Sequence, residues 1–215
     1  MSSLGPNEAR FTLVLPAEEV KLPYPTEIKD LPQQLTQKGA NRAKQLRKYF
    51  QNHNGAKVFD LIVTSQATIG IKTIMEVMEE CSIRRVEMPE LFYPQGKDAS
   101  DTYIRDSMQI FMNSVMSSAL DSYSFRGHEK ECEILKDLAT SAWSRLLQTV
   151  QKNKRRNIFI VGHNILMAAM IAWSGCCWEL GSDRITDHKF GACEGLELIV
   201  DLSYGVVSRS SIIRL

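Results

Sequence analysis

The sequence has few features that would place the protein in a membrane or in an oxidising compartment. Its longest apolar stretch, Ile165 to Trp173, is about half of what a bilayer crossing needs. The N-terminal segment reads MSSLGPNEAR and has no apolar signal region. The five cysteines are an odd number without a CxxC pair, so neither a disulfide framework nor a metal cage is expected. We therefore expect a cytoplasmic protein with reduced thiols, no metal, no cofactor and no membrane partner.

An excess of charge of one sign is also missing. Lys and Arg number 26 against 25 Asp and Glu, which gives a formal net charge of +1. The one basic cluster, 152–156, directly precedes a predicted strand, where a solvated loop is expected. This balance provides no electrostatic footprint for nucleic acid, so no nucleic acid partner is expected.

What is present is a chain long enough for one sizeable core. With 215 residues, 44% of them apolar, a second domain is not required, so we expect a single domain over 1–215. Apolar runs of strand length alternate with segments of helical spacing, which is typical of an α/β fold. The predicted strands are Phe11 to Leu15, Val58 to Thr64, Ile83 to Met88, Asn157 to Val161, Leu196 to Leu202 and, as a terminal edge strand, Val206 to Ile213.

The first predicted helix opens at Thr36 and closes at Asn54. Apolar or small residues at spacings of three and four predict an inward stripe, and the basic residues between them are predicted to face water. The stripe contains Leu35, Gly39, Ala43, Leu46 and Phe50, and the basic set contains Lys38, Arg42, Lys44 and Arg47. In the next helix, Ile71, Ile74, Met75 and Met78 keep helical spacing. Two longer helices with a break at Gly127 predict a helical hairpin at about 99–152.

An open α/β sheet places its ligands at the carboxyl ends of its strands. Four junctions therefore matter: Pro16 to Glu18, Ser65 to Ile69, Glu90, and Gly162 to Asn164. Their candidate ligand-binding residues are Glu18, Ser65, Lys72, Gly162, His163 and Asn164, and the candidate catalytic residues are His163 and Glu90.

Three short sequence motifs lie at or near these junctions. LTQKGANRA stands at 35–43, MPELFYP at 88–94 and VGHN at 161–164. In this order they resemble the histidine phosphatase superfamily, which includes phosphoglycerate mutases, acid phosphatases and small phosphohistidine phosphatases. The resemblance implies a three-layer α/β/α sandwich with a mostly parallel central sheet and one pocket over the carboxyl ends of its strands.

The chain departs from this family where the family's chemistry is carried out. The family's first strand ends in Leu-Val-Arg-His-Gly-Glu, and its histidine becomes phosphorylated. In register, this chain has Leu15, Pro16 and Ala17 in place of Arg-His-Gly. The family's second phosphate-binding arginine corresponds to Ile69. The resemblance thus implies a degenerate member that lacks the nucleophile and two guanidinium groups.

The physical consequence of these replacements is large. Phosphoryl transfer needs an in-line nucleophile and cations that hold the equatorial oxygens. Each charge-assisted contact contributes about 1.5–3 kcal/mol, so losing two weakens phosphate binding by about 3–6 kcal/mol. Removing a nucleophile lowers turnover by a factor on the order of a million. The sequence therefore predicts loss of the family's catalysis.

The retained residues each have two interpretations. His163 either binds a phosphoryl oxygen at a helix N-terminus or satisfies a backbone carbonyl in the core. Glu90 is an acid or a solvated loop residue, and Glu18 is a ligand or a surface residue. Lys72 and Lys97 either restore positive charge or are plain surface lysines.

Three functional hypotheses remain open. The first is a binding or scaffolding protein with a residual pocket for an anion, a phosphorylated small molecule or a protein partner. The second is an active phosphatase or phosphomutase-like hydrolase that uses His163 or another non-standard nucleophile. The third is an assembly module that acts through the helical hairpin. The sequence does not fix the oligomeric state.

Overall fold

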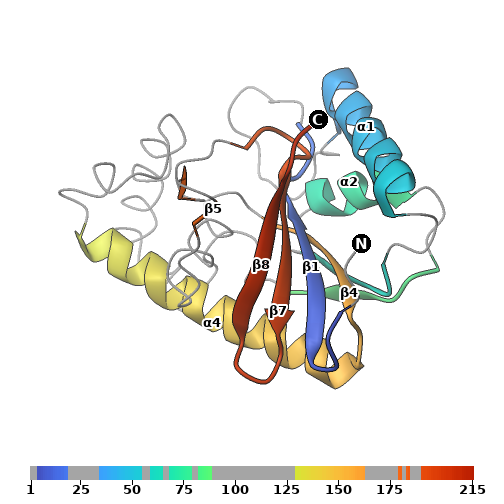
Figure 1. The fold of residues 1–215 in the computed structure, drawn as a ribbon. Helices are drawn as coiled ribbons and strands as arrows, with labels where there is room; N and C mark the ends of the chain where they lie inside the picture. The colour runs from blue at the N-terminus through green and yellow to red at the C-terminus, as the bar shows by residue number, and fades with distance from the viewer. Residues whose placement is uncertain are drawn as a thin grey trace.

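A six-stranded sheet with helices on both faces forms the centre of the protein (Figure 1). The structure is a computed structural model that describes residues 4–18, 34–54, 59–64, 68–78, 82–88, 129–162, 179–180, 183–184 and 190–215. The six strands are β1 (Glu8–Val14), β2 (Leu61–Thr64), β3 (Arg85–Glu87), β4 (Asn157–Val161), β7 (Gly195–Asp201) and β8 (Val206–Ile213). A separate pair contains β5 (Glu179–Leu180) and β6 (Asp183–Arg184).

The sheet is mostly parallel, as the sequence predicts. Its strand order is β3-β2-β4-β1-β7-β8. The pairs β3/β2, β2/β4 and β4/β1 are parallel, whereas β7 runs antiparallel to both β1 and β8. The carboxyl ends of β1, β2 and β4 therefore meet at one edge of the sheet, beside the start of β7.

Helices α1 (Gln37–Asn54) and α2 (Thr68–Met78) cover one face of the sheet. Phe50 of α1 lies edge-on to Phe159 of β4, with ring centroids 5.7 Å apart. Phe59, directly before β2, stacks on the same Phe159 ring at 4.9 Å. Burying these three rings and their aliphatic neighbours removes a large apolar area from water, which fixes α1 on this face.

Helix α4 (Glu129–Asn153) covers the opposite face. Phe11 of β1 pairs in register with Ile158, and its neighbour Thr12 pairs with Phe159. Since successive side chains of a strand point to opposite faces, Phe11 and Phe159 lie on different sides of the sheet. Phe11 contacts Trp143 of α4 at a centroid distance of 5.8 Å. These two contacts define three layers, α/β/α, and confirm the predicted architecture.

The element boundaries follow the sequence closely. β4 and β8 have the predicted bounds, and β8 is an edge strand as expected. β3 is shorter than its predicted range of 83–88, and β2 occupies only the end of 58–64. The second helix of the predicted hairpin is present as α4, whereas the segment of the first lies outside the described residues. The hairpin and the single domain remain predictions.

Three predictions about helix faces are wrong. Arg42 and Arg47 were predicted to face water, but both are half-buried because they bond to other elements. Arg47 donates to the carbonyls of Glu76 and Val77 at the end of α2. Met75 fits the apolar spacing of α2, yet its side chain is 62% exposed.

The described helices include none that is both long enough and apolar enough to span a bilayer.

Candidate functional site

The candidate site lies where β1, β2 and β4 end. Val14 and Thr64, the last residues of β1 and β2, both pair in register with Val161 of β4. The Gly162 amide continues this ladder and donates to the Val14 carbonyl at 3.5 Å. Gly162 and the segment 15–18 are therefore neighbours at one edge of the sheet, as the sequence predicts for two of its four junctions.

The other predicted site residues are only partly placed. Ile69 belongs to the first turn of α2, and Lys72 lies half-buried further along the same helix. The candidates Ser65, Glu90, His163 and Asn164 lie outside the described residues, and so does Lys97. Their predicted roles stay predictions.

The side chains of residues 15–17, directly after β1, are apolar and mostly buried. Leu15 is 7% exposed and Ala17 is 3% exposed, and Ala17 belongs to the core cluster beneath α1 and α2. Pro16 between them is half-buried. Within 15–17 no side chain can accept a phosphoryl group or pair with an anion. The first ionisable side chain of the segment is that of Glu18.

Three hydrogen bonds hold this segment, two to the residues before β7 and one to helix α2. The Leu15 amide donates to the Glu194 carbonyl at 3.0 Å, and the Cys193 amide donates to the Leu15 carbonyl at 3.2 Å. The Ala17 amide donates to Thr73 Oγ1 of α2 at 2.9 Å in a buried position. These bonds extend the β1–β7 pairing past the end of β1 and satisfy polar groups that burial would otherwise penalise.

The start of α1 closes the segment from the other side. The Thr36 hydroxyl accepts a hydrogen bond from the Gly39 amide at 2.8 Å, which is the geometry of a helix N-cap. The Thr36 amide donates to the Glu18 carbonyl at 3.0 Å. A Cβ at Gly39 would collide with the same Glu18 carbonyl, so the close approach requires glycine. The LTQKG motif thus docks α1 against the segment after β1.

Glu18 reaches the surface and pairs with Lys38. Its Oε2 lies 3.5 Å from Lys38 Nζ, with 46% and 75% of the two side chains exposed. Such an exposed ion pair contributes little to stability, typically less than about 1 kcal/mol. The Glu18 carboxylate is therefore accessible at the rim of the site.

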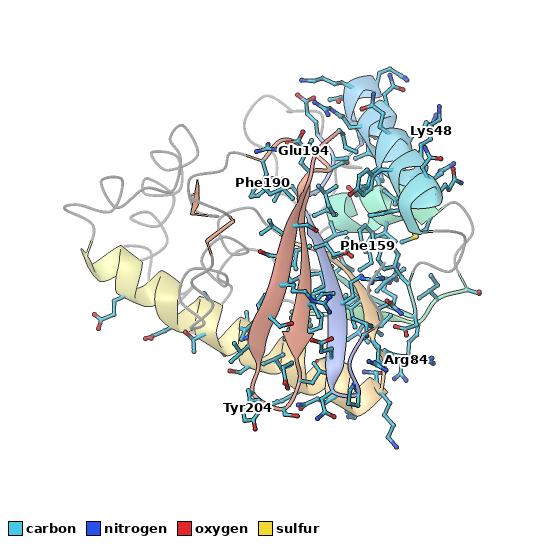
Figure 2. The ribbon with its side chains drawn as sticks, viewed as in Figure 1. Lys48, Arg84, Phe159, Phe190, Glu194 and Tyr204 are labelled. Carbon is cyan, nitrogen blue, oxygen red and sulfur yellow. The ribbon has the colours of Figure 1, made fainter. Side chains whose placement is uncertain are left out.

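A cluster of charged residues beside the site was missed by the sequence analysis. Glu194 precedes β7 and its side chain is 10% exposed. Arg214 Nη1 lies 3.0 Å from Glu194 Oε2, and Arg42 Nη1 of α1 lies 3.7 Å from Glu194 Oε1. Arg42 also donates to the Leu215 carbonyl at 2.7 Å. Figure 2 shows Glu194 at the end of β7 that lies near the C-terminus and α1.

Two titratable groups in this region have shifted pKa values. Burial raises the pKa of the Glu194 carboxyl, but hydrogen bonds from the Gly191 amide, Arg214 and the Leu215 amide outweigh it, and the net pKa is lowered. Burial raises the pKa of the Cys193 thiol to about 12, although Arg42 acts in the opposite direction. A thiol of this kind is a poor nucleophile near neutral pH, so its role is packing.

No group of three or more His, Cys, Asp or Glu side chains in the described ranges has the arrangement needed to hold a metal ion.

Comparison with solved structures identifies the fold. Phosphoglycerate mutase from Bacillus anthracis str. Sterne matches with a TM-score of 0.57 at 11% sequence identity, over 97% of this chain and 93% of that chain. YhfR from Bacillus stearothermophilus matches with a TM-score of 0.55 at 19% identity, over 92% and 93%. Phosphoserine phosphatase from Entamoeba histolytica, solved with 3-phosphoglyceric acid, matches with a TM-score of 0.52 at 13% identity, over 96% and 97%.

By sequence, no family model matches the chain, and no curated protein does. The structural matches nevertheless span 92–97% of this chain, at 11–19% sequence identity. The protein therefore has the fold of the histidine phosphatase and phosphoglycerate mutase-like proteins.

Proposed function

We propose that this protein is a catalytically impaired histidine phosphatase-like protein that acts by binding or scaffolding and retains a pocket for an anion. The observation that carries the proposal is the apolar segment after β1. Where the family places Arg-His-Gly, this chain has Leu15, Pro16 and Ala17, and Leu15 and Ala17 are packed into the protein.

The position of this segment explains why the replacement of Arg-His-Gly by Leu15, Pro16 and Ala17 should abolish phosphoryl transfer. It lies beside Gly162, so a phosphoryl group at the usual place would meet hydrocarbon instead of an imidazole. No side chain of residues 15–17 can replace the missing nucleophile. The thiol of nearby Cys193 is buried and its pKa is raised, so it is a poor substitute. Both facts favour binding over turnover.

The residual pocket is assigned to groups that tolerate an anion without attacking it. Gly162, His163 and Asn164 follow β4, and the sequence predicts a helix after them whose first backbone amides would favour negative charge. Ser65 and Lys72 belong to the junction after β2, and Lys72 would supply a positive charge in place of the one absent at Ile69. Glu18 and Glu90 would face the ligand from the rim.

The experiment is a turnover assay paired with a binding assay. The full chain and a His163→Ala variant are assayed on a panel of phosphomonoesters and for a covalent phospho-adduct trapped by denaturation at alkaline pH, where phosphohistidine is stable. Thermal melting is recorded with inorganic phosphate and sugar phosphates. We expect no turnover above that of a buffer control and a saturable rise in melting temperature that the His163→Ala variant reduces.

Each part of the proposal has a result that would overturn it. Turnover that His163→Ala abolishes would show an active hydrolase with a non-standard nucleophile and would overturn the loss of catalysis. A melting temperature that is unchanged by every phosphate compound would overturn the anion pocket.

A further inference from the structure

A half-buried arginine of helix α1 lies near the segment that follows β1. We infer that Arg42 binds a phosphate or phosphomonoester dianion in the candidate site, with its guanidinium in place of the one absent at Leu15. This inference rests on the proposed function and adds a binding residue to it. Neither the strand junctions nor the family motifs point to Arg42.

The fold brings the end of β8 to the same edge of the sheet as the candidate site. β7 runs antiparallel to both β1 and β8, so β8 is parallel to β1. Gly195 of β7 pairs with Val14 on one side and with Ile213 on the other. Figure 1 shows the C-terminus close to α1 and to the segment that follows β1. The residues after Ile213 are therefore neighbours of the candidate site.

Helix α1 reaches from the rim of the candidate site to the residues before β7. Gly39 lies against the Glu18 carbonyl at the rim. One turn further along the helix, Arg42 Nη1 lies 3.7 Å from Glu194 Oε1. The Glu194 carbonyl accepts the Leu15 amide at 3.0 Å. A single residue therefore links Arg42 to Leu15, the position at which the family has its first phosphate-binding arginine.

The guanidinium of Arg42 has donors that no described residue uses. Its Nη1 donates to the Leu215 carbonyl at 2.7 Å. In the part of the chain that the structure describes, Nε and Nη2 have no hydrogen-bond partner. Only 32% of the side chain is exposed, so burial partly separates the guanidinium from water. An acceptor bound at this place would satisfy these donors.

The neighbouring carboxylate attracts Arg42 without occupying its donors. Glu194 Oε2 accepts the Gly191 amide at 2.8 Å and lies 3.0 Å from Arg214 Nη1. The separation of 3.7 Å between Arg42 Nη1 and Glu194 Oε1 is longer than a hydrogen bond. Two guanidinium groups therefore face one carboxylate side chain, and positive charge exceeds negative charge among these side chains.

A phosphate dianion suits this arrangement. The planar fork of a guanidinium donates two parallel hydrogen bonds to two oxygens of one phosphate group. The proposed pocket also contains Lys72 of α2, and a dianion gains from two cations more than a monoanion does. Because residues 15–17 offer no nucleophile, Arg42 would hold the phosphate group without its transfer to the protein.

The test is isothermal titration calorimetry of the full chain with inorganic phosphate in a chloride buffer at neutral pH. Arg42→Gln removes the charge, and Arg42→Lys keeps the charge but has no planar fork. Lys44→Gln is the matched control, because it removes a charge from an exposed position of the same helix. Thermal melting in phosphate-free buffer shows that each variant is folded.

We expect the affinity for phosphate to fall at least about tenfold in Arg42→Gln. In Arg42→Lys it should fall by about threefold or more, because a lysine makes a single point contact. It should change less than about twofold in Lys44→Gln, whose charge lies at the solvated surface. If Arg42→Gln does not fold, Arg42→Lys and the following measurement test the inference.

Nuclear magnetic resonance provides a readout that a structural role of Arg42 would not change. In the ¹⁵N-labelled full chain, the Nε–H signal of Arg42 is identified by its absence from the spectrum of Arg42→Lys. We expect this signal to shift on addition of phosphate and to saturate at the dissociation constant that calorimetry gives.

The outcomes separate this inference from the proposed function. Phosphate binding that Arg42→Gln leaves unchanged, or an Arg42 Nε–H signal that does not shift, would overturn the inference and leave the anion pocket intact. Equal losses of affinity in Arg42→Gln and Lys44→Gln would show general charge attraction without a contact and would also overturn it. An original chain that does not bind phosphate would overturn the inference and the anion pocket together.

Discussion

Arg214 holds the buried carboxylate of Glu194 across the open end of the β7–β8 pair, with Arg214 Nη1 at 3.0 Å from Glu194 Oε2. The same carboxylate accepts the Gly191 amide at 2.8 Å and lies 3.7 Å from Arg42 Nη1 of α1. The Glu194 carbonyl accepts the Leu15 amide. A single residue therefore joins the segment after β1, helix α1 and the end of β8.

This position makes Glu194 a stability determinant. Glu194→Ala leaves two arginines and the Gly191 amide without their shared acceptor, so we expect the free energy of unfolding to fall by about 1.5–3 kcal/mol. Urea unfolding followed by circular dichroism measures the change. The control is Glu87→Ala, because Glu87 pairs with Arg85 at 3.4 Å while both side chains are more than 40% exposed. The control should cost no more than about 0.5 kcal/mol, and equal losses in the two variants would contradict the assignment.

The lowered pKa of Glu194 predicts a dependence of stability on pH. In the folded state the pKa lies below its ordinary value of 4.5, so the unfolded state binds the proton more readily. The stabilisation is therefore complete above about pH 5 to 6 and is lost as pH falls through 4.5 and below. The difference in unfolding free energy between the original chain and Glu194→Gln should shrink over this range. A difference that stays constant from neutral pH to below pH 4 would show that Glu194 does not titrate with folding.

The sequence predicted the layers well because those depend on local patterns. Asn157–Val161 is an apolar run bounded by polar residues, and its strand has the predicted bounds. Thr36 caps the start of α1 by accepting the Gly39 amide, which is a contact within four consecutive residues. Such features can be predicted from neighbouring residues alone, whereas the close approach of Gly39 to Glu18 is a tertiary contact.

The charged cluster could not be predicted in this way. Arg42, Glu194 and Arg214 are distant in the sequence and meet only because β7 and β8 return beside α1. On α2 the apolar spacing predicted that Met75 faces inward, but Thr73 is buried and its hydroxyl accepts the Ala17 amide. The buried face of α2 therefore contains Thr73, Ile74 and Val77, and Met75 lies outside it.

The residues of the candidate site stay predictions. The strand pattern predicts that the segments after β1 and β4 lie at one edge of the sheet, and the bond from the Gly162 amide to the Val14 carbonyl brings these two segments together. The roles of His163 and Glu90 depend on side-chain positions that a strand pattern does not contain. The assays on His163→Ala proposed above test the role of His163.

The close approach at Gly39 predicts a penalty for any side chain there. Alanine favours helices over glycine by about 1 kcal/mol, so Gly39→Ala would stabilise an isolated helix. In the protein the new methyl group would collide with the Glu18 carbonyl and push α1 away from the segment after β1. We expect a net destabilisation of about 1 kcal/mol or more by urea unfolding. Gln45→Ala, at an exposed position of the same helix, should stay within about 0.5 kcal/mol. A stabilised Gly39→Ala variant would contradict the close contact.

The buried bond between Ala17 and Thr73 predicts the effect of removing one hydroxyl. Thr73→Val keeps the shape of the side chain but leaves the Ala17 amide without its acceptor in a buried position, which costs about 1–3 kcal/mol of unfolding free energy. Thr73→Ser is the matched control, because it keeps the hydroxyl and loses only a methyl group. Amide hydrogen exchange separates a local effect from a global one: the Ala17 amide should exchange faster in Thr73→Val by more than the drop in global stability explains, and it should remain protected in Thr73→Ser. If the serine variant loses Ala17 protection as fully as the valine variant, packing of the methyl group holds the segment, and the hydrogen bond does not.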